Sequence, residues 1–167
     1  MVQFTLIDPV TGKQWNVNKA GLTRELRLNC ILLRDGEHLG IITHRDMVAF
    51  TRWCADEMLA RLRHKPDQKV THALTLVDRW LEDEKSVTNE ELEAARNTTW
   101  AARNVAKRLG TARAAEAIWA AICTIQSVYT SESAADATDA AARNATWYAK
   151  TSYEAQAQWL VEHLAEV

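Results

Sequence analysis

The distribution of alanine and glycine divides this sequence into two parts. From Ala94 onward the chain holds 22 alanines and a single glycine, whereas four of its five glycines fall within the first 40 residues. Alanine is the strongest intrinsic helix former and glycine is among the weakest. We therefore predict a mainly α protein, a multi-helix bundle over residues 44–167, preceded by a small hairpin-containing segment of strands and turns over residues 1–43.

The first 43 residues carry short apolar runs separated by turn-forming residues. Phe4–Ile7 and the stretch 14–17 flank a turn-rich segment that contains Pro9 and Gly12, which is typical of two paired strands. Two further strands are predicted over 28–33 and 39–43, because the Asp35-Gly36 pair between them is a hairpin signal. A helical turn is expected around residues 22–26.

Apolar residues at helical spacing predict five helices in the rest of the chain, over about 44–63, 67–82, 89–109, 112–129 and 133–165. Thr43 is the expected N-cap of the first, and Pro66 suits the first turn of the second. Thr88 with Glu91 fits a capping box, and Gly110 suits the position just after a helix. The last helix is long enough to kink near residues 151–152.

A nine-residue motif occurs twice in the Ala-rich part. Residues 94–102 and 141–149 are identical at seven of nine positions, and a weaker copy ends at Trp119. An offset of 47 residues suits a duplicated helix pair. Each copy places an arginine four residues before a tryptophan, where the guanidinium can stack on the indole. These residues either fill space between helices or form a recognition surface, and they are Arg96, Trp100, Arg143 and Trp147.

Acidic residues gather around the predicted junction of the second and third helices. The acids at the start of the third helix suit a helix N-terminus, but those at the end of the second oppose the helix dipole. The cluster is therefore either a solvated loop or a patch that docks on a basic protein partner. Its candidate partner-binding residues are Asp78, Glu82, Asp83, Glu84, Glu90 and Glu91.

No motif of a known catalytic, cofactor or metal site is present in the sequence. The three cysteines are widely spaced, and no Cys/His set has zinc-ligand spacing. Cys54 falls on the apolar stripe of its helix, which favours burial over reactivity. A net charge of −2 gives no basic stripe for nucleic acid, and no apolar run approaches the roughly 20 residues of a membrane span. We expect no enzyme, no cofactor, no direct nucleic-acid binding and no membrane.

Residues 52–106 resemble a family of Ala-rich helical proteins of bacteria and phages that are described as immunity proteins. The resemblance lies in Trp53-Cys54-Ala55, in Val77-Asp78-Arg79-Trp80 and in the stretch 91–96. The family usually has Arg-Pro and Gly-Glu pairs where this chain has residues 70–72 and 83–84. The resemblance implies a non-enzymatic protein that neutralises another protein, such as a toxin or, in the anti-CRISPR manner, a defence nuclease.

Three hypotheses of function follow from the sequence. The first is a phage- or bacteria-encoded inhibitor that binds a protein partner in the cytoplasm of a bacterial cell. The second is a structural or assembly protein whose Trp-bearing helices self-associate. The third, an enzyme of unfamiliar type, would need a pocket of perturbed titratable groups that the sequence does not indicate.

Overall fold

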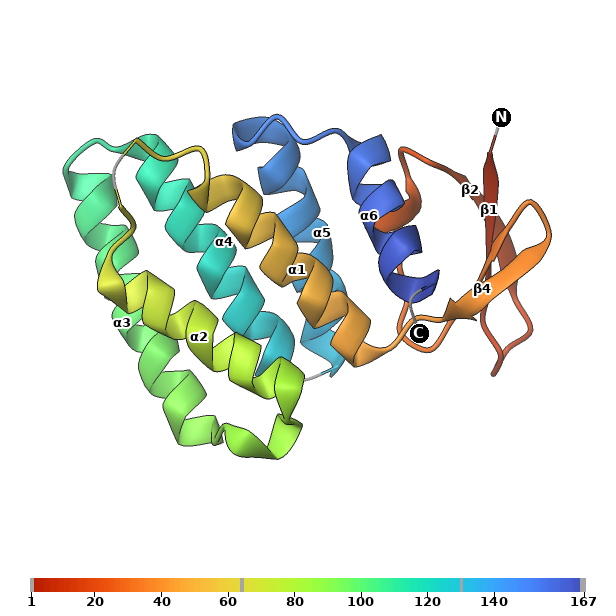
Figure 1. Ribbon diagram of the computed structural model, residues 1–167, viewed down its shortest axis with the longest axis horizontal. Coiled ribbons are helices and arrows are strands. Elements are labelled where there is room, and N and C mark those ends of the chain that lie inside the picture. Colours follow the sequence, from red (N-terminus) through yellow and green to blue (C-terminus); the bar gives the residue numbers. More distant parts are fainter. Residues whose placement is uncertain (1, 64, 130, 166–167) are drawn as a thin grey trace.

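The computed structural model describes residues 2–63, 65–129 and 131–165, and it confirms the predicted fold class. These residues form a small antiparallel sheet followed by six α-helices (Figure 1). The sheet lies at one end of the molecule, and helices α1 to α5 make up the bulk of the other end.

The four strands form one antiparallel sheet in the order β2-β1-β3-β4. Asp35 and Gly36 connect β3 to β4 with φ angles of +48° and +84°, as the predicted Asp-Gly hairpin requires. The pairing of β1 with β3, which joins the two hairpins, is a non-local contact that the sequence did not indicate. The strands are β1 (Gln3–Ile7), β2 (Gln14–Asn18), β3 (Ile31–Arg34) and β4 (Glu37–Ile41).

The helices begin where local capping chemistry predicts. Thr43 and Thr88 each accept a hydrogen bond from the backbone three residues on, and the acid there bonds back, so both form capping boxes. Gly110 adopts a φ of +73° after α3, as expected. The helices are α1 (His44–Leu59), α2 (Gln68–Glu82), α3 (Asn89–Arg108), α4 (Ala112–Tyr129), α5 (Ser131–Tyr148) and α6 (Tyr153–Ala165), with 3-10 turns at Leu22–Arg24 and Glu84–Ser86.

Two predictions at helix ends were wrong. The first helix ends at Leu59 instead of residue 63, because the following turns tighten to i→i−3 bonds such as Leu62 N to Leu59 O. Pro66 does not stand in the first turn of α2, since the N-cap of α2 is Asp67, whose carboxylate accepts a hydrogen bond from the Lys69 backbone. Proline therefore precedes the cap.

The predicted helix over 133–165 is two helices, α5 and α6. Lys150 adopts a φ of +55°, and the Thr151 backbone N–H donates to Ala145 O at 3.2 Å, which closes α5. Ser152 then caps α6 by accepting a hydrogen bond from the Ala155 backbone at 3.0 Å. The expected kink is thus a complete break, and it lets α6 turn toward the sheet.

Helices α3, α4 and α5 lie side by side with α4 in the middle, and α1 and α2 pack across them. Both connections beside α4 are short, so α3 and α5 run antiparallel to α4 and parallel to each other. This arrangement brings the two copies of the repeated motif to opposite sides of the same central helix.

A single hydrophobic core joins the sheet to α6. Phe4, Leu6 and Leu32 of the sheet are buried against Leu160 and its neighbours on α6. The fully buried Gln156 ties this core to α5: its amide nitrogen donates to Ala142 O and Thr146 Oγ1, both at 3.0 Å, and its oxygen accepts from Thr23 Oγ1 at 3.2 Å. The N-terminal segment therefore packs on the last helix of the chain.

Candidate functional site

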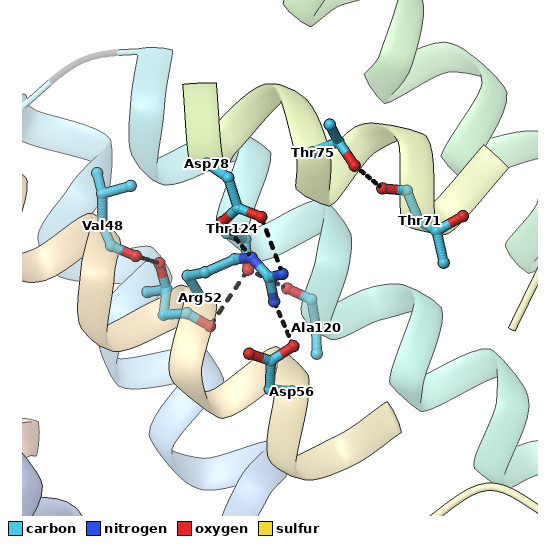
Figure 2. A network of polar contacts seen from close by, with 9 residues as sticks. Val48, Arg52, Asp56, Thr71, Thr75, Asp78, Ala120 and Thr124 are labelled. Carbon is cyan, nitrogen blue, oxygen red and sulfur yellow. Dashed lines mark hydrogen bonds and ion pairs between the residues drawn. The ribbon is translucent and has the colours of Figure 1, made fainter. Parts of the chain in front are cut away.

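Asp78 is held within the fold by an arginine of the neighbouring helix (Figure 2). Arg52 Nε donates to Asp78 Oδ1 at 2.9 Å and Arg52 Nη2 to Oδ2 at 3.2 Å, while Nη1 bonds Asp56. Burial lowers the pKa of Arg52, but the two carboxylates outweigh burial and raise it overall. The negative charge of Asp78 is thus compensated by a contact between α1 and α2.

The other acidic candidates fall into two groups. Asp83 caps the 3-10 turn by accepting from the Lys85 backbone, and Glu91 caps α3 while pairing with Arg79 at 3.5 Å. In contrast, Glu82, Glu84 and Glu90 are exposed, and no ion pair to them is found within the described part of the chain. We call these three residues, at the connection between α2 and α3, the acidic turn.

The two copies of the repeated motif have the same local structure. Thr99 Oγ1 donates to Ala95 O, and the equivalent Thr146 Oγ1 donates to Ala142 O. The equivalent alanines are buried, Ala95 with residues of α2 and Ala142 with residues of α1. The arginine and tryptophan of each copy therefore have equivalent positions on α3 and α5.

A groove runs between α3, α4 and α5. It consists of two adjoining hollows of about 380 and 520 Å³ that share Trp119 and Ala140. The first is lined by the first copy of the motif and the second by the second copy, and all of the lining residues come from α3, α4 and α5. We call this the tryptophan groove; its side chains used below are Arg96, Trp100, Trp119, Arg143, Asn144 and Trp147.

The predicted stacking of each motif's arginine on the tryptophan four residues later was wrong. The guanidinium over the Trp100 ring is that of Arg103, 5.3 Å from the ring centre, and Arg103 also lies 4.8 Å from the centre of the Trp119 ring. Trp100 and Trp119 meet edge to face at 5.5 Å. In the second copy, Arg143 pairs with Asp139 at 3.1 Å instead of covering the tryptophan. Trp147 consequently remains 80% exposed.

Buried hydrogen-bond donors are concentrated around this groove. Arg96 Nε, Arg103 Nε and Asn144 Nδ2 are the buried side-chain polar atoms without a hydrogen-bond partner among the described residues. Arg96 and Asn144 line the groove, and Arg103 stacks on two of its tryptophans. Unpaired buried donors are rare in folded proteins and cost free energy, so their gathering beside one groove distinguishes it from the rest of the described structure.

Sequence reasoning missed Trp119, Arg103 and Asn144 as members of this face. The weaker third copy of the motif was the signal for Trp119, since it places a tryptophan on the helix between the other two. Asn144 belongs to the repeat itself. The position of Arg103, by contrast, depends on how α3 packs against α4 and has no signature in the sequence.

No protein-family model, curated protein or solved structure matches the chain. The resemblance to immunity proteins therefore stays a prediction. The ten candidate partner-binding residues also stay predictions, although the structure places four of them along one groove and compensates the charge of Asp78.

The thiols of this protein are not arranged as nucleophiles. Burial raises the pKa of Cys123, at the floor of the tryptophan groove, to about 12, although Arg103 acts in the opposite direction. Burial also raises the pKa of Cys30 and raises that of Cys54 well above its usual value. The predicted burial of Cys54 is confirmed. A protonated, buried thiol is a poor nucleophile, so these side chains serve packing.

Metal-ligating clusters and membrane-spanning helices are both absent from residues 2–63, 65–129 and 131–165. Within these ranges no three His, Cys, Asp or Glu side chains are grouped as a metal ion would need. None of the helices in the same ranges is both long enough and apolar enough to cross a membrane. The tryptophan groove is the candidate site because four of the residues predicted from the sequence, Arg96, Trp100, Arg143 and Trp147, line it together.

Proposed function

We propose that this chain is a non-enzymatic protein, encoded by a phage or a bacterium, that inhibits a protein partner by occupying the partner's working surface. The observation that carries the proposal is the meeting of two copies of one Arg/Trp motif on a single groove, with Trp147 left 80% exposed. Exposed aromatic rings that gather beside a hollow, unlike single exposed apolar residues, are typical of a surface that binds another protein.

The chemistry of the groove suits a protein partner. Tryptophan, tyrosine and arginine are the residues most enriched among those that dominate protein–protein binding energy. Here three tryptophans, Tyr148 and two arginines line adjoining hollows. Half-buried rings that meet edge to face, such as Trp100 and Trp119, are already ordered, so they lose little conformational freedom on binding.

The class of partner is inferred from the resemblance to immunity proteins and from the net charge of the chain. A defence nuclease or a toxin is the kind of protein that an immunity or anti-CRISPR inhibitor neutralises in the bacterial cytoplasm. The net charge of −2 gives the chain as a whole no general electrostatic attraction to nucleic acid. Self-assembly is the alternative, and it is supported by the opposite charges at the two ends of α2 and α3.

The proposal can be tested by comparing what three forms of the protein capture. Wild type, the double variant Arg143→Ser/Trp147→Ser and the control Val10→Ser are immobilised and exposed to lysates of bacteria with and without phage infection. Both altered groove side chains are exposed, and Val10 is a 90% exposed apolar residue of the N-terminal segment, so all three forms should fold.

We expect wild type and Val10→Ser to retain a nuclease or toxin that the double variant does not. The retained protein, once purified, should lose its activity when one equivalent of wild-type chain is added. Retention of the same proteins by all three forms would contradict the assignment of the groove. Retention without any loss of the partner's activity would contradict inhibition as the function.

A further inference from the structure

A second hollow, of about 250 Å³, opens where α1, α3 and α4 meet the connection between α1 and α2. Its lining is largely apolar and includes Leu59, Val105, Leu109 and Ile118. Val105 is 49% exposed and Leu109 is 74% exposed. The fold thus leaves an apolar depression open at one end of the bundle, with room for an aliphatic side chain.

Basic residues surround this hollow. Arg63 and Lys65 line it, four further basic residues are next in sequence to lining residues, and Lys69 lies two residues after the lining Asp67. All are exposed, and no ion pair to any of them is found in the described part of the chain. Asp67 is the one carboxylate in the lining. We call the set the basic end: Arg61, Arg63, Lys65, Lys69, Lys107, Arg108 and Arg113.

Helix stability accounts for only part of this set, because Lys107 and Arg108 stand in the last turn of α3, where cations are favourable, whereas Lys69 and Arg113 stand at helix N-termini. Lys69 is the second residue of α2 and Arg113 is the second residue of α4, and neither helix has an acid in its first turn. A helix N-terminus favours negative charge, so cations there are destabilising unless an anion compensates them. Glu82 of the acidic turn is unfavourable in the same way, because it stands at the C-terminus of α2, whereas Glu90 stands in the favourable first turn of α3.

The basic end and the acidic turn lie at opposite ends of α2 and α3 (Figure 1). The 15 residues of α2 separate them by roughly 22 Å. The Debye length is about 10 Å at 0.1 M salt, so the two charged ends of one molecule are screened from each other. Charges in contact between two molecules are not screened to that extent.

We propose that the acidic turn of a second copy of this chain occupies the hollow at the basic end. Opposite charges match in this contact, whereas contact between two basic ends or two acidic turns would place like charges together. Leu81, directly before Glu82, packs against the hydrophobic cluster of its own chain, so the contact is made by the charged side chains of the turn with those at the rim of the hollow. The contact joins the acidic turn of one molecule to the basic end of the next, so it is heterologous. The first and last molecules of such an assembly still have one free end each, and further copies can therefore add to form an open chain.

This contact uses no residue of the tryptophan groove that the partner-binding proposal relies on. Its failure would therefore leave that proposal standing, and the reverse also holds. Self-association through charged ends gives the assembly alternative a defined surface and a defined geometry.

Two charge-reversal variants test the contact. The first, Glu82→Lys/Glu84→Lys, makes the turn basic; the second, Arg63→Glu/Lys65→Glu, makes the opposite end acidic. All four positions are exposed. Average mass is measured by sedimentation or light scattering against the 18.8 kDa of a single chain, at about 0.1 M and about 1 M salt. The control Glu25→Lys/Glu37→Lys reverses two exposed acids away from both ends.

For wild type and the control, we expect the average mass to rise with concentration at low salt and to return toward a single chain at high salt. Each reversal alone should remain a single chain. An equimolar mixture of the two reversals should associate again, because the basic turn of one now matches the acidic end of the other. The proposal is overturned if wild type stays a single chain under both conditions, or if the mixture does not regain association.

Discussion

Trp100 and Trp147 occupy the same position in two copies of one motif, but only Trp100 is packed. Trp100 meets Trp119 edge to face at 5.5 Å and lies under Arg103, whereas Trp147 is 80% exposed at the far end of the same groove. Arg103 reaches from α3 to Trp119 of α4 and covers Trp100, whereas the position that corresponds to Arg103 after the second copy is Lys150, beyond the end of α5. Equivalent residues thus have different roles.

Replacing each of these tryptophans by alanine should separate packing from recognition. Trp100→Ala removes a half-buried ring from the core and should lower the free energy of unfolding by about 2 kcal/mol, below the cost at a fully buried site. Trp147→Ala should change it by less than about 0.5 kcal/mol, since the ring contributes little to packing. Urea titration of both variants checks this, and an equal loss for the two would contradict the assignment.

The buried amide of Gln156 should be important for stability. Gln156→Leu keeps the approximate size of the side chain but leaves Thr23 Oγ1 and Ala142 O without this partner. We expect a loss of about 1–3 kcal/mol in the free energy of unfolding. Gln158→Leu is the matched control: Gln158 is exposed and bonds Glu162 on the surface, so its replacement should have little effect. Similar losses in both variants would refute the role of the buried amide.

The capping carboxylate of Glu91 should make stability fall in acid. The hydrogen bond from the Thr88 backbone lowers the pKa of Glu91 below its usual 4.5, and Arg79 lowers it further. Because the folded-state pKa lies below the unfolded one, the stabilisation is present above about pH 4.5 and is lost as the pH falls through the lowered pKa. Urea midpoints measured between about pH 5 and 3 should fall less steeply for Glu91→Gln than for Glu93→Gln, an exposed control.

The three cysteines should be inert in the folded protein. Burial raises the pKa of each, and Cys123 reaches about 12, so the thiolate fraction near pH 8 is very small. Ellman's reagent should modify no thiol quickly under native conditions and all three after unfolding in guanidinium chloride. Rapid native labelling of Cys123 would show that the floor of the tryptophan groove is open and reactive.

Local features of the fold were predictable from the sequence. The capping boxes at Thr43 and Thr88 and the Asp35-Gly36 hairpin depend on residues close together in the chain, so the pattern alone indicates them. The break between α5 and α6 was not predicted in full, because a lysine takes the left-handed position where glycine is usual.

Contacts between residues that are far apart in the chain could not be predicted from the sequence, for a different reason. The packing of α6 on the sheet, held by Gln156, depends on contacts between the two ends of the chain. The arginine and tryptophan pairs were identified as candidates, but their convergence on Trp119 and the role of Arg103 follow from the order of α3, α4 and α5. Sequence spacing describes one helix face and does not say which helix covers it.

The most direct test of the central claim is the affinity of the captured partner for wild type and for Trp147→Ser, measured by titration calorimetry with Val10→Ser as control. A tryptophan that is a main contact of a protein interface typically contributes about 2 kcal/mol or more, so we expect Trp147→Ser to weaken binding by at least about 30-fold while the control is unchanged. Equal affinity of wild type and Trp147→Ser would show that the tryptophan groove is not the binding surface.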